Sequence, residues 1–419
     1  MGEVLDFSNI SPHIHRLLQE IGRFGEETSQ SVYVVGGFVR DVLIRRENLD
    51  IDIVVEGDAV DFAHQLAEVW ESKVQAHCQF KTATITRLDG LRLDFVTARN
   101  ETYPSPGALP SVEYGTIVED LRRRDFSINA LAMRLQPDTF GELIDCTDGL
   151  QDLQAGCIRV LHERSFIDDP TRIFRAIRYE GRYNFQIAES DQRRMLDTIQ
   201  QGVLNLISGQ RIQNEIDHIL SEEAAPQMIK RLGVFDLFGT IHPTWNPSPN
   251  FDGLWTTAVQ AIKWALTSLP NEPINTRAIL WMTLLTDMDS IEIISNRLGL
   301  ENELCTKLSA QAQLEHDLDA LPVSSKPSEV YQLLNPYPIE SIIFVLTQPS
   351  QPSWRVEKMS NYLTHLRSVQ PLVTGDNLIQ QGLKPSRAFS DLLWKAFAAQ
   401  LDGKVSTTQE IYQFLDIEN

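Results

Sequence analysis

Strand-forming patterns in this chain of 419 residues are confined to one region near the N-terminus. Between residues 31 and 135, β-branched residues and two-residue alternation predict five strands. Their sequences are VYVV (32–35), DIDIVV (50–55), KTATITRL (81–88), LRLDFVTA (91–98) and INALAMRL (128–135). Helices are expected between them at about 38–46 and 58–72. From about residue 150 onward, apolar residues recur with a helical period instead. The pattern predicts an α+β fold, in which a small head with a mixed sheet and helices precedes an elongated all-α body.

Composition is that of an ordinary globular protein. Hydrophobic residues make up 42% and charged residues 22% of the chain, which predicts about two to four folded domains. No apolar run approaches the roughly 20 residues that a membrane helix needs, and the first residues lack the order of a signal peptide. The four cysteines lie without CxxC spacing, which favours reduced thiols. We expect a cytoplasmic protein without a membrane association, and no feature implies a protein partner.

The net charge of −20 argues against a general nucleic-acid binder, because non-specific binding relies on neutralising phosphates. It leaves open a nucleic-acid enzyme with a local basic surface. Arginines do cluster, at Arg122–Arg124, at Arg172, Arg175, Arg178 and Arg182, and at Arg193–Arg194. Each cluster alone is equally well explained by a solvated face with compensating acids.

Three aspartates lie in the predicted strands of the head. Residues two apart in a strand point to the same face, so Asp50 and Asp52 share a face, and Asp94 alternates in the same way with Leu93 and Phe95. If the two strands are neighbours, three carboxylates converge, and a divalent cation would relieve their repulsion. Magnesium suits carboxylates completed by substrate phosphates. The alternative is an acid cluster neutralised by nearby arginines.

A glycine pair precedes the first two of these aspartates. Gly36 and Gly37 allow a tight turn and a close approach to a ligand, and a helix that starts there points free amides at an anion. Arg40 lies one turn further on. A glycine pair alone usually marks only a turn, but with Asp50 and Asp52 about thirteen residues later it is typical of a triphosphate cradle beside a metal site.

At this point the chain resembles a known family. The spacing GG-x-VRD-x-L-x(6)-D-x-D is similar to that of the polymerase-β-like nucleotidyltransferases that include class II tRNA nucleotidyltransferases and bacterial poly(A) polymerases. Further blocks resemble the family in order: TARNETY (97–103), EDLRRRDFSINALAM (119–133), LIDCTDGLQDL (143–153), DDPTRIFRAIRY (168–179), SGQRIQNEI (208–216) and, more weakly, 375–405. We find no such block between residues 240 and 370.

The resemblance implies an enzyme that adds nucleotides to an RNA 3′ end and releases pyrophosphate. Asp50 and Asp52 would hold Mg²⁺, with Asp94 as third catalytic carboxylate. The nucleotide would contact residues of the glycine turn and of the two arginine-rich blocks. In this reading Gly36, Gly37 and Arg40 hold the triphosphate, Asp125 receives the ribose 2′-hydroxyl with support from Arg124 and Asn129, and Asp168, Asp169, Arg172, Arg175 and Arg178 complete the pocket.

Base choice is expected from Asp169 and Arg172. Residues three apart are neighbours on one helix face, and a carboxylate beside a guanidinium complements the amine and ring nitrogen of cytosine or adenine. The alternative is a surface ion pair of little energetic value. Asp168 stands where the family has Glu. Because its side chain is shorter, the sequence does not show whether it holds Arg172 as the family Glu would.

The resemblance divides the chain into a nucleotidyltransferase head (1–148), a helical neck (149–222), a helical body (223–345) and a helical tail (346–419) that binds tRNA through Lys384 and Arg387. We expect addition of C, A or both to the tRNA 3′ end from CTP and ATP, and the untruncated loop at 99–121 slightly favours CCA or A addition. Two alternatives are a bacterial poly(A) polymerase and a non-catalytic RNA-binding relative. Intact Asp50 and Asp52 argue against the second.

Overall fold

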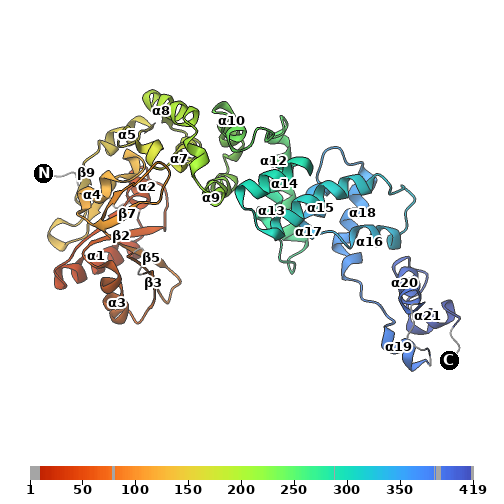
Figure 1. The fold of residues 1–419 in the computed structure, drawn as a ribbon. Helices are drawn as coiled ribbons and strands as arrows, with labels where there is room; N and C mark the ends of the chain where they lie inside the picture. The colour runs from red at the N-terminus through yellow and green to blue at the C-terminus, as the bar shows by residue number, and fades with distance from the viewer. Residues whose placement is uncertain (1–9, 78–80, 287, 382, 384–387, 417–419) are drawn as a thin grey trace. The chain divides into compact units, whose positions relative to one another are not determined.

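The computed structural model describes residues 10–77, 81–286, 288–381, 383 and 388–416 (Figure 1). The chain forms two compact units, Met1–Thr240 and Ile241–Asn419. Within the described residues, no helix is long and apolar enough to cross a membrane. The expected order of a mixed-sheet head followed by helices is confirmed.

The head contains a seven-stranded sheet with the order β3-β4-β5-β2-β1-β8-β9. Its strands are β1 (Ser31–Val35), β2 (Ile51–Glu56), β3 (Lys73–His77), β4 (Thr82–Thr86), β5 (Arg92–Thr97), β8 (Leu131–Arg134) and β9 (Leu143–Asp145). Neighbouring strands are antiparallel except for β2 and β5, which are parallel. The sheet is therefore mixed, as predicted.

Two helices, α1 (Pro12–Glu27) and α3 (Ala59–Val69), bury one face of this sheet. Phe62 of α3 packs on Phe95 of β5 at 5.9 Å between ring centroids, and on Phe24 of α1 at 5.1 Å. Ile53 and Phe95 are fully buried on this face. Because side chains alternate along a strand, Asp52 and Asp94 are left on the opposite face.

Two expected strands differ in their extent. Asp50 precedes β2 and is exposed, so only Asp52 of this pair lies in a strand. In INALAMRL the strand begins only at Leu131, because Ser127–Asn129 form a short 3-10 helix. The region 99–121, for which no regular structure was predicted, also contains secondary structure. It contains the hairpin β6 (Arg99–Thr102) and β7 (Ser111–Tyr114) and the helix α4 (Ile117–Arg122).

The remainder of the first unit is mainly helical. Its elements are α2 (Gly37–Leu43), α5 (Gly149–Ala155), β10 (Cys157–Ile158), α6 (Ser165–Asp168), α7 (Thr171–Tyr183), β11 (Gln186–Ile187), α8 (Glu189–Gln200), α9 (Gly209–Leu220), α10 (Ala225–Val234) and α11 (Leu237–Ile241), which ends at the boundary between the units. Helix α7 contacts both α9 and α10. Helix α7 carries the arginines between Arg172 and Arg182, and α8 carries Arg193 and Arg194.

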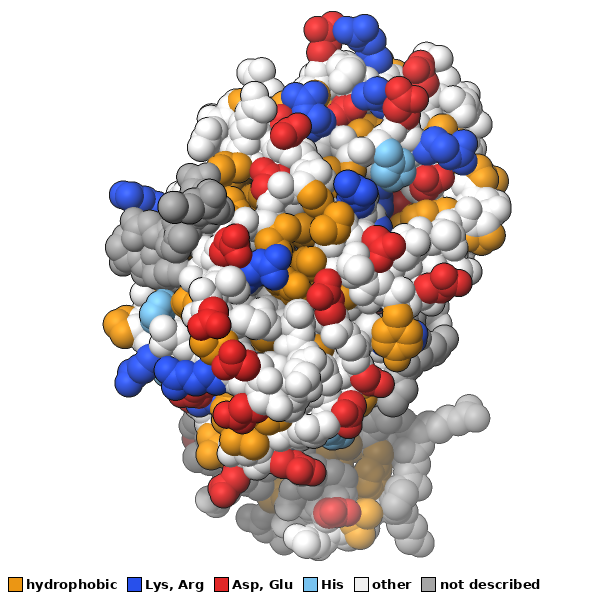
Figure 2. Space-filling view, turned by 90° about the vertical axis from the view of Figure 1, so that its left-hand side faces the viewer, with side chains coloured by type: hydrophobic (Ala, Val, Ile, Leu, Met, Phe, Trp, Pro, Cys, Tyr) orange, Lys and Arg blue, Asp and Glu red, His pale blue; other side chains and the backbone are white. Residues whose placement is uncertain are grey.

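Figure 2 shows one side of the molecule in space-filling form. Acidic and basic side chains are interspersed over this face, with apolar side chains between them. Among the residues drawn in colour, no continuous basic surface crosses it. This agrees with the expectation that RNA binding cannot rest on overall charge.

The second unit consists of helices. They are α12 (Phe251–Ser268), α13 (Thr276–Met282), α14 (Met288–Leu298), α15 (Asn302–Leu318), α16 (Pro327–Leu334), α17 (Ile339–Leu346), α18 (Ser353–Thr364), α19 (Gly375–Gln380), α20 (Ala388–Leu401) and α21 (Thr408–Phe414). Helices α12, α13, α15 and α17 pack together around Trp281 and Phe344, which are fully buried. Tyr331 of α16 meets Phe397 of α20 edge to face at 5.1 Å. The finer division at residues 148, 222 and 345 stays a prediction.

Candidate active site

The three aspartates of the head form a cluster. Parallel pairing of β2 with β5 sets Asp52 beside Asp94, and Asp50 lies two residues before Asp52. One carboxylate oxygen from each lies within 4.8 Å of the others. Thr84 on β4 donates a hydrogen bond to Asp94 at 2.5 Å. The geometry expected from the sequence is therefore present.

Electrostatics indicate that this cluster suits a cation. Burial raises the pKa of Asp52 to about 6; Arg124 opposes this rise, whereas Asp50 and Asp94 add to it. Clustered carboxylates with raised affinity for protons also attract metal ions. The cluster can therefore hold a divalent cation.

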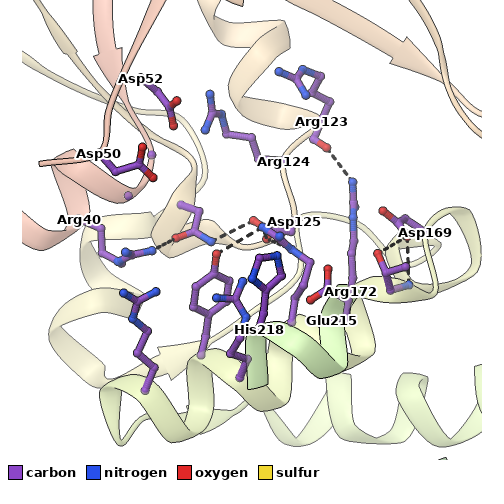
Figure 3. Close-up of a pocket in the computed structure, with 18 of the residues that line it drawn as sticks. Arg40, Asp50, Asp52, Arg123, Arg124, Asp125, Asp169, Arg172, Glu215 and His218 are labelled. Carbon is purple, nitrogen blue, oxygen red and sulfur yellow. Dashed lines mark hydrogen bonds and ion pairs between the residues drawn. The ribbon is translucent and has the colours of Figure 1, made fainter. Parts of the chain in front are cut away.

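A cavity of about 610 Å³ opens beside the cluster (Figure 3). It brings together most of the metal-binding and nucleotide-binding residues expected from the sequence. These are Gly36, Gly37, Arg40, Asp50, Asp52, Arg124, Asp125, Asn129, Asp169, Arg172, Arg175 and Arg178. Two expected residues line other cavities. Asp94 faces a neighbouring one on the far side of Asp50. Asp168 turns into another, where it pairs with Arg164 at 3.4 Å.

The glycine turn shapes one end of this cavity. Gly36 has φ of +69° and donates its N–H to the carbonyl of Leu131 at 2.9 Å. A Cβ at this position would lie 2.7 Å from NH1 of Arg124. A side chain at position 36 would thus be strained and would displace the guanidinium of Arg124, whose charge acts on Asp52, so the turn requires glycine.

Arg40 is buried beneath the turn and is already engaged. Its NH1 donates to Asn129 at 2.5 Å and its Nε donates to Asp41 at 2.8 Å. The guanidinium also lies 4.5 Å from the ring centroid of Tyr183. These contacts tie α2 to the 3-10 turn and to α7, so Arg40 fixes the shape of the cavity as well as its charge.

The Asp125 carboxylate already accepts four hydrogen bonds. Its Oδ2 accepts from Nε and NH2 of Arg175 at 2.8 and 2.5 Å, and its Oδ1 accepts from the Phe126 N–H and from Asn129 at 2.9 and 3.0 Å. Burial would raise the pKa of Asp125, but the charge of Arg175 and the bond from Asn129 hold it well below its ordinary value. A ribose hydroxyl that reached this carboxylate would therefore compete with four existing donors.

The expected placement of Asp169 and Arg172 on one helix face is wrong. Helix α6 ends at Asp168 and α7 begins at Thr171, so Asp169 lies between them with φ −132° and ψ 95°. Pro170 accounts for this, because the residue before a proline is driven to extended conformations. Both side chains nevertheless line the cavity.

The side chains of Asp169 and Arg172 are each held by other residues and not by one another. Arg172 is buried and donates to Ser165 at 2.6 Å and to the carbonyl of Arg123 at 2.9 Å. Asp169 accepts from NH2 of Arg211 at 2.7 Å. An ordinary surface ion pair between Asp169 and Arg172 is thereby excluded.

Helix α9 contributes cavity residues that were not singled out from the sequence. Glu215 and His218 line the cavity. Arg211 does not line it but donates a hydrogen bond to Asp169, which does. Their spacing of four and three residues places them on one helix face, and this polar periodicity was the signal that could have revealed them. Burial raises the pKa of Glu215, against the charges of Arg175 and Arg178. Lys384 and Arg387, expected to bind RNA, lie outside the described residues.

A carboxylate cluster on a small mixed sheet, joined to an arginine-lined cavity and followed by helices, defines a nucleotidyltransferase of the polymerase-β-like class. Comparison with known proteins agrees with this. Residues 32–159 match the family described as the poly(A) polymerase head domain.

Two curated relatives extend the similarity over the chain. An A-adding tRNA nucleotidyltransferase of Geobacter sulfurreducens is 33% identical over 403 residues, covering 94% of this chain and 46% of the relative. One of Halalkalibacterium halodurans is 31% identical over 406 residues, covering 95% and 91%. A solved CCA-adding enzyme in an apo form is 33% identical, covers 99% of each chain and superposes with a TM-score of 0.81. The chain belongs to the tRNA nucleotidyltransferase family, although it spans less than half the length of the Geobacter relative.

Proposed function

We propose that this protein adds nucleotides of the CCA terminus to the 3′ end of tRNA, using ATP, CTP or both and releasing pyrophosphate. One observation supports this above the others: a cavity whose wall includes Asp50 and Asp52 of the carboxylate cluster also presents, elsewhere in its wall, a carboxylate and a guanidinium able to read a base. Both relatives named above are A-adding enzymes. Addition of the terminal A is therefore the first activity to test.

In this proposal Asp50, Asp52 and Asp94 hold Mg²⁺, for which oxygen ligands completed by substrate phosphates are suitable. When bound, the metal lowers the barrier by stabilising charge on the attacking and leaving oxygens. The protein supplies positioning. Thr84 orients Asp94, and Arg124, anchored on buried Asp120 at 3.0 Å, lies beside the glycine turn.

The nucleotide is oriented by the two ends of the cavity. Its triphosphate lies at the turn of Gly36 and Gly37, near the carboxylates. Its base lies toward Asp169 and Arg172, where a carboxylate acceptor and a guanidinium donor match the exocyclic amine and adjacent ring nitrogen of adenine and cytosine. Uracil and guanine would place a carbonyl oxygen against the carboxylate. The protein itself thus takes the place of a template.

The acceptor is proposed to be tRNA, bound in part by Lys384 and Arg387. The protein is proposed to act in the cytoplasm. The alternative of a poly(A) polymerase is less well supported, because both curated relatives carry tRNA nucleotidyltransferase names over nearly the whole chain. The alternative of a non-catalytic relative is opposed by the complete carboxylate cluster.

The test is incubation with tRNAs that end in the discriminator base, in C and in CC, with CTP and ATP supplied separately and Mg²⁺ present. We expect A incorporation into the tRNA ending in CC, and the other two substrates show whether C is added as well. Asp52→Asn is the inactive control. Processive A addition to an unrelated RNA would instead indicate a poly(A) polymerase. Absence of incorporation into every substrate would contradict the proposal.

A further inference from the structure

The side chain of Arg211 connects three segments that are distant in the sequence. From the first turn of α9, its NH2 donates to Oδ1 of Asp169 at 2.7 Å, and its NH1 donates to the carbonyl of Gly107 at 2.8 Å. Gly107 lies in the loop between β6 and β7, and Asp169 lies between α6 and α7. One guanidinium thus bridges a loop of the head and the residue proposed to read the base.

This bridge determines how the carboxylate of Asp169 is turned. Three donors converge on its Oδ1: the N–H of Thr171 at 3.0 Å, the hydroxyl of Thr171 at 2.6 Å and NH2 of Arg211 at 2.7 Å. Within the described part of the chain, the other oxygen, Oδ2, has no hydrogen-bond partner. Since Asp169 lines the cavity, Oδ2 is the oxygen left to accept from a base amine (Figure 3).

Without Arg211 this orientation would be less constrained. Both remaining donors come from Thr171, which immediately follows Pro170, and an aspartate side chain has a broad terminal torsion. A charge-assisted bond from a rigid guanidinium fork is stronger and more directional than a neutral one. Side-chain exposure is 25% for Arg211 and 22% for Asp169, so solvent screens this pair less than an exposed surface pair.

The second end of the bridge is itself fixed. The N–H of Gly107 donates to the carbonyl of Ile167 in α6 at 3.2 Å. Gly107 has φ of +71°, and a Cβ there would lie 3.1 Å from Cγ2 of Ile207 and 3.4 Å from Cβ of Leu206. The loop therefore packs closely against the segment that leads into α9, and glycine permits this approach. The Gly107 carbonyl provides Arg211 with an anchor independent of Asp169.

We propose that Arg211 is a specificity-positioning residue: anchored on the Gly107 carbonyl, it holds one oxygen of Asp169 so that the other faces the base of the incoming nucleotide. Arg211 does not contact the reacting atoms. This inference deepens the proposed function and rests on it.

The test compares Arg211→Gln with the wild type on one tRNA acceptor, with kcat/KM measured for ATP, CTP, UTP and GTP. Relaxed orientation should lower the preference for the accepted bases over UTP and GTP by about tenfold, the low end of what a good bidentate contact provides. Binding of the triphosphate, which is proposed to lie at the glycine turn, should not depend on Arg211. The inhibition constant of pyrophosphate should therefore stay close to the wild-type value. Gln210→Ala is the matched control, because Gln210 is adjacent on α9 and, among the described residues, its side chain hydrogen-bonds only to Asn214, at 3.0 Å. Its four-way ratio should equal that of the wild type.

Two further variants separate positioning from charge and from folding. Arg211→Lys keeps the charge but cannot span both acceptors with a rigid fork, so it should also lose selectivity. Gly107→Ala strains the loop and should lower the ratio without altering Arg211 itself; combined with Arg211→Gln, it should add little, because both act through the same bridge. Each variant is compared with the wild type by thermal unfolding.

The results divide clearly. A folded Arg211→Gln enzyme with an unchanged four-way ratio would overturn the inference, as would an equal loss for all four nucleotides, which would indicate a purely structural role. Full selectivity in Arg211→Lys would also overturn it, since charge alone would then suffice. Failure of the proposed function itself is distinct, because the wild-type protein would then incorporate no nucleotide into tRNA.

Discussion

Arg175 donates both Nε and NH2 to a single oxygen of Asp125, at 2.8 and 2.5 Å, across a separation of 50 residues. The pair joins α7 to the turn that follows α4, and it lies in the wall of the cavity. The Asp125 side chain is 9% exposed and that of Arg175 is 32% exposed. The contact therefore couples the head to the helix that carries the other pocket arginines, in addition to shaping the nucleotide site.

The first prediction concerns this pair. Arg175→Met keeps most of the aliphatic volume but leaves Asp125 buried without its cation, which should lower the free energy of unfolding at pH 7 by about 3 kcal/mol. In the wild type the pKa of Asp125 lies below its ordinary value. The pair therefore stabilises the fold above the unfolded-state pKa, and this contribution is lost as the pH falls through the folded-state pKa.

In the variant, burial without Arg175 should raise the pKa of Asp125 instead, so the variant should lose stability as the pH rises. The difference in unfolding free energy between wild type and variant should grow from about pH 4 to pH 7. Urea unfolding at several pH values measures it. A difference independent of pH would show that lost packing, and not the charge pair, is responsible.

The second prediction concerns Asp52. Asp52→Asn removes an anionic ligand while keeping the shape, so nucleotide incorporation should fall by about three orders of magnitude or more. The free energy of unfolding of the metal-free variant should instead increase. Because the pKa of Asp52 is raised to about 6, its ionised form disfavours the folded state above that pH, and the penalty shrinks as the side chain becomes protonated.

In EDTA at pH 8 the Asn variant should therefore melt higher than the wild type, by roughly 2–6 °C, and the gain should be smaller at pH 5. Added Mg²⁺ should raise the Tm of the wild type more than that of the variant. Differential scanning calorimetry provides all of these comparisons. A lower Tm for the variant in EDTA would contradict the picture of uncompensated carboxylates.

The third prediction concerns the support of Asp94. Thr84→Val removes the hydroxyl that donates to this carboxylate at 2.5 Å without changing the shape of the side chain. Loss of a group that orients a metal ligand should raise the Mg²⁺ concentration for half-maximal activity by about tenfold. Thr86→Val is the control, because Thr86 is exposed on the same face of β4. A Thr84→Val enzyme with an unchanged Mg²⁺ requirement would remove Asp94 from the metal site.

Local features of the site were predictable from the sequence because they depend on short-range geometry. Two-residue alternation placed Asp52 and Asp94 on one face of their strands, and the observed register sets them side by side. The glycine pair marked a turn, and Gly36 does adopt a positive φ. Such features follow from strand periodicity and backbone sterics alone.

Contacts between distant segments were not predictable in this way. The bridge from Arg211 to Asp169 and the saturation of Asp125 by Arg175 depend on how α7 and α9 pack against the head. The misplacement of Asp169 on a helix face was avoidable, because Pro170 alone disfavours a helical conformation at the preceding residue.

The last prediction concerns the orientation of Asp169. In Asp169→Asn, the amide oxygen should keep the position of Oδ1, because Thr171 and Arg211 offer three donors to it. The amide nitrogen would then replace Oδ2 and present a donor to the base. An amine of adenine or cytosine meets this donor unfavourably, whereas a carbonyl oxygen of guanine or uracil accepts from it.

We therefore expect kcat/KM for ATP and CTP to fall by about 10–100-fold and the preference over UTP and GTP to collapse. The Tm should stay near the wild-type value, since the amide oxygen still accepts from the N–H at the start of α7. Asp169→Ala is the matched comparison: it loses the hydrogen bonds from Thr171 and should cost about 1 kcal/mol of stability, while leaving no group that discriminates between the bases. Measurement of all four nucleotides on one tRNA, with thermal unfolding of each variant, separates the two effects. If Asp169→Asn kept the wild-type four-way ratio, Asp169 would serve only to link Thr171 to Arg211 and would have no part in base choice.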